Sequence, residues 1–246
     1  MNIFDIHIKN GEIIDGTGAP KFKSDIVIDK GKIIGVFPPE NGDVRDPSEN
    51  HFLSNFSAKN IIDAENKIVS PGFIDVHTHD DDNVFIDPSM SSKISQGVTT
   101  CVAGNCGISL APFSYKGEVP APIALLGKSE AFRFPRVSDY REEFIDKPSS
   151  VNLALLTGHS MLRVEAMNGE FDRAATSKEI SKMVDKLILS LEDGSIGLST
   201  GLAYPAANDA PTSEIIELAK ILPEFNGIFT THMRNEAIDV IKSVNE

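Results

Sequence analysis

The sequence predicts an α/β protein in which a small β module precedes a run of βα units with a parallel sheet. In the first part, short stretches alternate apolar and polar side chains between turn residues, a pattern typical of half-buried strands. Farther along, short apolar stretches alternate with amphipathic helical segments, which is typical of parallel strands covered by helices on both faces. We therefore expect two domains, over residues 1–70 and residues 71–246.

The β module begins with a strand in which Phe4, Ile6 and Ile8 alternate with polar residues, and we expect this strand to end at the turn residues Asn10-Gly11. A polar, Asp-, Asn-, Ser- and Pro-rich insert near residues 38–60 is expected to be a loop or a partly disordered segment. We predict a small sandwich-like module, with His7 and His51 as structural or surface residues without a partner. The other expected strands cover residues 12–14, 24–28, 33–37, 61–62 and 67–69.

The second part is organised by five expected strands and at least two helices. The clearest helix follows the capping box Thr176–Glu179, after which apolar residues recur at helical spacing as far as Asp193-Gly194. A second helix is expected over residues 212–222. Residues 104–136 are rich in Pro and Gly, and we expect a functional loop over the site. The five strands are expected at residues 73–79, 98–103, 151–157, 196–202 and 227–232.

Composition excludes several classes of function. The 246 residues carry a net charge of −13, so nucleic acid and anionic membrane surfaces are poor partners. The sequence has no apolar run of transmembrane length and no signal-peptide pattern at its start. Two cysteines do not make a disulfide framework. These features predict a soluble protein of a reducing compartment, the cytoplasm.

His77 and His79 close the first of the five strands, and they are the strongest candidates for metal ligands. Side chains at i and i+2 share one face of a strand, so the two imidazoles can converge on a cation. Two ordinary histidines satisfied within a strand are the alternative. Cys106 and His232 follow or end other strands, and catalytic groups of parallel barrels gather at the carboxyl ends of strands. A thiolate together with imidazoles favours Zn²⁺, whereas a cysteine serving as a small buried apolar residue is the alternative for Cys106 and our expectation for Cys101.

Several motifs resemble known proteins. The stretch Pro71–His79 resembles the first barrel strand of the amidohydrolase superfamily. Residues 95–100 resemble one branch of that superfamily, the N-acyl-D-amino-acid deacylases or D-aminoacylases. So do residues 104–112, which begin with Gly-Asn-Cys-Gly. The likeness covers nearly the whole chain apart from the insert. It continues in the same order through residues 158–160, 197–201 and 231–236.

The resemblance implies a zinc-dependent hydrolase that splits the amide bond of N-acyl-D-amino acids with a metal-activated water. It assigns His77 and His79 to one metal position, and Cys106 and His232 to a tightly held zinc. The family takes a further zinc histidine from a sixth strand and its catalytic Asp from an eighth, so the general base is expected beyond the chain end. His159 and Arg234 are candidate substrate contacts, although an ordinary surface ion pair is the alternative for Arg234.

A (β/α)₈ barrel needs eight strands, and the sequence provides about five. The last segment, residues 237–244, is amphipathic and stops without a cap. We therefore expect an incomplete TIM-like barrel that is the N-terminal half of a longer protein, with its own C-terminal half as a partner. Two alternatives remain: a fragment or subunit that binds zinc without turnover, and an amidohydrolase acting on cyclic amides or dipeptides. Cys106 disfavours the latter, because a carboxylated lysine often bridges the metals in those relatives.

Overall fold

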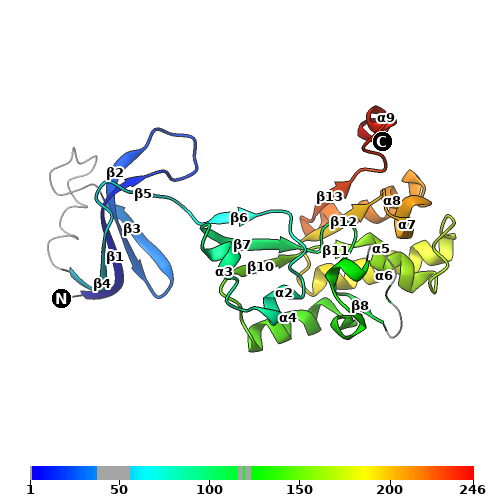
Figure 1. The fold of residues 1–246 in the computed structure, drawn as a ribbon, viewed down its shortest axis with the longest axis horizontal. Helices are drawn as coiled ribbons and strands as arrows, with labels where there is room; N and C mark the ends of the chain where they lie inside the picture. Colours follow the sequence, from blue (N-terminus) through cyan, green and yellow to red (C-terminus); the bar gives the residue numbers. More distant parts are fainter. Residues whose placement is uncertain (1, 38–55, 116–118, 120–122) are drawn as a thin grey trace. The chain divides into compact units, whose positions relative to one another are not determined.

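The computed structural model describes residues 2–37, 56–115, 119 and 123–246 (Figure 1). The chain divides into two compact units, Met1–Gly72 and Phe73–Glu246. Within the described residues, no helix combines the length and apolar character needed to cross a membrane.

The first unit contains a mixed sheet built around its longest strand, β1 (Asn2–Ile13), which pairs antiparallel with β2 and parallel with β4 and β5. The strand order is β3-β2-β1-β4, with β5 beside the end of β1. The sandwich-like expectation is therefore wrong for the described residues, which form one sheet because β1 accepts neighbours on both edges. The remaining bounds are Phe22–Asp29 for β2, Lys32–Phe37 for β3, Phe56–Asp63 for β4 and Ile68–Val69 for β5.

β1 does not end at the expected turn. It continues through a bulge at Asn10, whose φ of +63° is a value that asparagine tolerates better than most residues. A Cβ at Gly11 would lie 2.7 Å from Val69 Cγ2, so glycine at this position lets β5 approach closely. His7 has a partner after all, since its Nε2 lies 2.8 Å from Asp25 Oδ2. β4 begins inside the expected insert, and His51 lies outside the described residues.

In the second unit, parallel strands alternate with helices as predicted. β6 (Phe73–Asp75), β7 (Val98–Ala103) and β10 (Asn152–Leu155) form one sheet. A second sheet contains β11 (Thr157–Gly158), β12 (Gly197–Gly201) and β13 (Ile228–His232). The predicted third strand is divided into β10 and β11, and the amide of the intervening Leu156 donates to Ala103 O at 2.9 Å. The strand order across each sheet follows the order along the chain, β6-β7-β10 in one and β11-β12-β13 in the other, as Figure 1 shows.

Three helices pack on one another and on β12 through a shared apolar cluster that includes Leu162, Leu187, Leu198 and Leu218. They are α5 (His159–Ala166), α6 (Ser177–Glu192) and α8 (Thr212–Ala219). The predicted capping box at the start of α6 is confirmed. The second predicted helix stops at Ala219 and is followed by a 3₁₀ turn, η3 (Leu222–Phe225), in which Pro223 provides no amide donor. The other helices are α2 (Asn83–Ile86), α3 (Ser91–Ile94), α4 (Val137–Asp146), α7 (Pro205–Asn208) and α9 (Val240–Asn245).

Beyond the short segment 104–107, the described parts of residues 104–136 build the core, so the expectation of a functional loop over the whole stretch is wrong for them. Phe113, Phe132 and Phe134 are buried in the largest apolar cluster, beside strand β7. The reason is composition, because the Pro and Gly residues are interspersed with large apolar side chains that need burial. The elements here are β8 (Phe113–Ser114), η1 (Ile123–Leu126), η2 (Ser129–Ala131) and β9 (Arg133–Phe134).

β6 and β13 are edge strands of their sheets, and their apolar side chains are exposed. Phe73 and Ile74 on β6 are each 60% exposed, although the sequence predicted a buried strand. Ile228 and Phe229 on β13 are 47% and 44% exposed. Among the described residues, each of these strands pairs with one neighbour only.

Candidate metal centre

His77 and His79 lie just beyond β6, which is shorter than the predicted strand. The chain continues beside β7 past the end of β6, because the amide of Thr78 donates to Val102 O at 3.2 Å. The two imidazole rings meet edge to face with their centroids 5.6 Å apart. The side chains thus lie together, as the i, i+2 spacing indicated.

Cys106 lies in a tight loop, Gly104–Gly107, that directly follows β7. Gly104, Cys106 and Gly107 all have positive φ, at +77°, +56° and +74°. A Cβ at Gly107 would lie 2.7 Å from the amide nitrogen of Gly201, so this position requires glycine. Cys106 itself is a non-glycine residue in the left-handed region, and such residues persist only where their surroundings hold them.

The loop brings the Cys106 thiol to the two histidines. Cys106 Sγ lies 3.1 Å from His77 Nε2, and one ligand atom from each of His77, His79 and Cys106 lies within 4.8 Å of the others. His232, the last residue of β13, places Nδ1 at 3.7 Å from the same sulfur. Cys101 is buried within β7, where it pairs with Asp75 of β6. The structure therefore brings together the four residues that the sequence singled out.

Tyr204 also reaches this cluster, and it was missed by the sequence analysis. Its hydroxyl lies 3.1 Å from His232 Nδ1, and its ring centroid is 4.8 Å from that of the histidine. Glu236 Oε1 lies 3.0 Å from His232 Nε2, which leaves the imidazole oriented by a partner at each nitrogen. Tyr204 closely follows the carboxyl end of β12, so its position after a strand was the available signal.

The electrostatics of the cluster suit metal ligation. Burial lowers the pKa of His79, which keeps its imidazole neutral and able to donate a lone pair. Burial raises the pKa of the Cys106 thiol, so without a nearby cation the sulfur keeps its proton. Burial, together with the adjacent Cys106, raises the pKa of Tyr204, which therefore remains a hydrogen-bond donor.

Beside the histidines, Lys93 neutralises two carboxylates. Its Nζ lies 2.6 Å from Asp75 Oδ2 and 3.0 Å from Asp80 Oδ2. The hydrogen bond from Lys93 lowers the pKa of Asp75, so this carboxylate is ionised and engaged. Asp75 is thus a partner of Lys93 on α3, and neither aspartate is free to serve as a base.

The three aspartates that follow His79 in the sequence differ in environment. Asp81 is fully buried, and its Oδ2 accepts the amide of Gly104 at 3.3 Å. Burial raises the pKa of Asp81 to about 7. Asp82 Oδ1 lies 3.9 Å from a guanidinium nitrogen of Arg133. Asp81 therefore supports the loop that carries Cys106, a contact across 23 residues of sequence that no local pattern reveals.

His159 lies in the interior, where a substrate cannot reach it. Its side chain is fully buried, and its Nε2 lies 2.9 Å from Glu214 Oε1. Arg163 donates to both oxygens of the same carboxylate at 2.6 Å. The expectation of a substrate contact at His159 is corrected accordingly, since this residue joins α5 to α8 through a buried ionic cluster.

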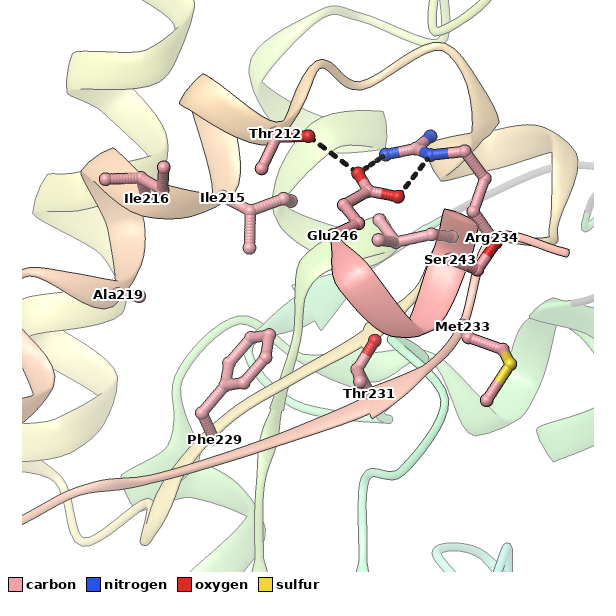
Figure 2. Close-up of a pocket in the computed structure, with 11 residues that line it drawn as sticks. Thr212, Ile215, Ile216, Ala219, Phe229, Thr231, Met233, Arg234, Ser243 and Glu246 are labelled. Carbon is pink, nitrogen blue, oxygen red and sulfur yellow. Dashed lines mark hydrogen bonds and ion pairs between the residues drawn. The ribbon is translucent and has the colours of Figure 1, made fainter. Parts of the chain in front are cut away.

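Arg234 is engaged in an ion pair. Its Nη2 lies 2.7 Å from Glu246 Oε1 and its Nε lies 3.0 Å from Glu246 Oε2, as Figure 2 shows. Nη2 also donates to Ala210 O at 3.0 Å. The guanidinium lines a pocket beside β13 together with Thr212 and Ser243. This arrangement corresponds to the ion-pair alternative for Arg234 and not to a free substrate-binding fork.

Comparison with known proteins identifies the relatives of this fold. The model of a protein family described as "Amidohydrolase family" matches residues 60–244. The chain belongs to the amidohydrolase family. The core of this superfamily is a TIM-type barrel, which agrees with the parallel strands and alternating helices of the second unit.

Among the similar proteins is a D-aminoacylase from Alcaligenes xylosoxydans xylosoxydans, 40% identical over 99% of this chain and 47% of the relative. An N-acyl-D-aspartate deacylase from the same organism is 39% identical over 98% of this chain and 46% of that protein. The crystal structure of a D-aminoacylase that defines a subset of amidohydrolases superposes with a TM-score of 0.88, at 42% identity over 98% of this chain and 48% of that one. The N-acyl-D-glutamate deacylase from Bordetella bronchiseptica, complexed with zinc and a phosphonate inhibitor, gives a TM-score of 0.87 at 39% identity, over 98% of this chain and 48% of that one. This chain spans about half the length of the relatives it matches.

Proposed function

We propose that this chain is the zinc-binding N-terminal portion of a hydrolase that cleaves the amide bond of N-acyl-D-amino acids. The observation that carries the proposal is the convergence of His77, His79 and Cys106, whose ligand atoms lie within 4.8 Å of one another. Membership of the amidohydrolase family and the likeness to D-aminoacylases support the reaction and the configuration of the substrate.

The donors in this cluster fit zinc. His79 Nδ1 is buried without a hydrogen-bond partner, as expected for a ligand atom reserved for a cation. One thiolate with imidazoles is a donor set that prefers Zn²⁺ to Mg²⁺ or Ca²⁺. His77, His79 and Cys106 would hold the metal, with His232 beside Cys106 as a further ligand. A bound zinc would supply a polarised water and a Lewis acid for the amide carbonyl.

The protein groups around the cluster have separate tasks. Tyr204 directs its hydroxyl toward the edge of the cluster, where it can donate to an oxygen that gains charge during amide hydrolysis. Glu236 fixes the orientation of the His232 ring. Lys93 holds the carboxylates of Asp75 and Asp80 in ion pairs. A reducing compartment such as the cytoplasm would keep the Cys106 thiol free for this role.

We assign the general base to strands outside the described residues. The carboxylates flanking the cluster are engaged with Lys93, His232 or the Gly104 amide. The exposed apolar side chains on the two edge strands, such as Ile74 on β6 and Ile228 on β13, support an incomplete (β/α)₈ barrel. In a closed barrel, further strands would lie between β6 and β13, and a C-terminal half of the same protein is the partner that fits.

A zinc-binding chain without turnover is the second candidate function, and the same exposed edges favour it for these 246 residues. The test is hydrolysis of N-acetyl-D-methionine and N-acetyl-L-methionine in the presence of zinc. The chain is assayed alone and after mixing with a separately expressed C-terminal half of the barrel. We expect turnover only in the mixture, with preference for the D substrate, and none when the chain carries Cys106→Ser.

Robust turnover by the chain alone would refute the assignment of the base to other strands. A mixture that binds zinc and assembles but hydrolyses neither substrate would favour the non-catalytic alternative. Equal rates with both enantiomers would contradict the assigned substrate class.

A further inference from the structure

The Ser199 side chain on β12 forms hydrogen bonds with both ends of the loop that carries Cys106. The side chain is fully buried. Its Oγ accepts the amide of Gly107 at 3.0 Å and donates to the carbonyl oxygen of Gly104 in a short hydrogen bond. A single hydroxyl thereby joins the first and last residues of the Gly104–Gly107 loop.

This bridge also ties the loop to the strand pair that carries His232. Ser199 pairs with Thr230 of β13, and two positions farther along the same ladder Gly201 pairs with His232. Cys106 and His232 come from elements 126 residues apart in sequence, yet their side chains lie 3.7 Å apart. The Ser199 hydroxyl is a direct link between the backbone of one ligand and the sheet of the other.

Other contacts hold the loop from β7 and α5. Asn105 donates from Nδ2 to Val102 O at 2.9 Å, and the amide of Ser160 donates to Gly107 O at 2.9 Å. Neither contact joins the two ends of the loop. Only a group that both donates and accepts can do so, which a hydroxyl provides and a methyl group does not.

We propose that Ser199 is a positioning residue that sets the Cys106 thiol toward the metal site before any metal is bound. The role in metal binding rests on the proposed zinc function, whereas the preset loop is a property of the metal-free chain. Ser199 acts through the loop backbone and does not touch the metal or the substrate.

The first test measures the affinity of the chain for Co²⁺, whose bond to a thiolate gives a near-ultraviolet charge-transfer band. We expect Ser199→Ala to weaken Co²⁺ binding about tenfold or more, as is typical when support of a ligand is removed. Ser199→Thr, which keeps a hydroxyl, should bind more tightly than the alanine variant. Ser190→Ala is the matched control, because Ser190 is also buried and its hydroxyl donates to Lys186 O at 2.7 Å within α6. Equal affinity of Ser199→Ala and the wild-type chain would overturn the proposal.

The second test asks whether Ser199 acts through the thiol. In a chain that already carries Cys106→Ser, adding Ser199→Ala should leave the remaining Co²⁺ affinity within about twofold, since the group being positioned is gone. A further tenfold loss in this background would show a general structural effect and contradict the proposal.

The third test needs no variant, and it remains decisive if Ser199→Ala does not fold. Hydrogen exchange is measured at the Gly107 amide of the metal-free wild-type chain. We expect slow exchange, because this amide is bonded to Ser199 in a preset loop. Exchange at the rate of an unstructured peptide would overturn the proposal. Slow exchange in a chain that binds no metal would instead refute the zinc function and leave the preset loop standing.

Discussion

Glu214 carries a charge in the interior of the second unit, where its side chain is fully buried. Burial alone would raise its pKa, but hydrogen bonds from His159 and Arg163 outweigh that effect and lower it. Glu214→Gln would leave the Arg163 charge unpaired at a fully buried position, so we expect the free energy of unfolding to fall by about 3 kcal/mol. Urea denaturation measures this loss.

Glu217→Gln provides the control for that prediction. Glu217 lies on the same helix and pairs with Lys220 at 2.5 Å, but both side chains are exposed. We expect this change to cost less than about 1 kcal/mol. If Glu217→Gln lowered the free energy of unfolding as much as Glu214→Gln does, burial of the Glu214–Arg163 pair would not explain the loss.

At the scale of residues, sequence identified His77, His79, Cys106 and His232, which the structure places near one another. It found them because strand ends and residue types are local signals. Tyr204, Asp81 and Ser199 were missed, since their roles depend on contacts between segments far apart in the chain. His159 was misread because its partner Glu214 lies 55 residues away.

At the scale of elements, α6 is the helix that its sequence determines most fully. Thr176 Oγ1 accepts the amide of Glu179 at 3.3 Å, and Glu179 Oε2 accepts the amide of Thr176 at 2.7 Å. We expect Thr176→Ala to lower the free energy of unfolding by about 1 kcal/mol, because a helix-terminal amide loses its acceptor. Thermal denaturation measures this effect, with Ser177→Ala as the neighbouring exposed control. Equal shifts for both variants would contradict the capping role.

Helices with a strong apolar periodicity were predicted well. The bounds and exposure of strands that depend on neighbouring segments were not. β6 is only three residues long and exposed, since an apolar run does not reveal which strand will cover it. β1 continues past Asn10-Gly11 because β2 pairs with it on both sides of the bulge and β5 pairs with it beyond the bulge. The Pro and Gly of residues 104–136 predict a functional loop, although aromatic residues among them form core.

At the scale of the whole molecule, the edges of the two sheets make the isolated chain prone to self-association. Exposed edge strands with apolar side chains are templates for pairing with another chain. We expect the apparent mass in sedimentation velocity to rise with concentration. The double change Ile74→Lys and Ile228→Lys should suppress this rise, because charged side chains block edge pairing.

Ile145→Lys is the matched control for this prediction, since Ile145 is 65% exposed but lies on helix α4. This variant should associate as the wild-type chain does. A wild-type chain that sediments as a monomer at all concentrations would contradict the account of open sheet edges.

The most direct measurement of the central claim compares zinc binding by Cys106→Ser and Cys101→Ser. Both cysteines are free and buried, so the two variants make the same chemical change at two places in one fold. Zinc affinity is measured by competition with a chromophoric chelator, and Co²⁺ reports a thiolate ligand through its charge-transfer band. The account predicts that Cys106→Ser loses tight zinc binding and the band, whereas Cys101→Ser retains both. Retention of the band in Cys106→Ser, or its loss in Cys101→Ser, would contradict a metal centre built from His77, His79 and Cys106.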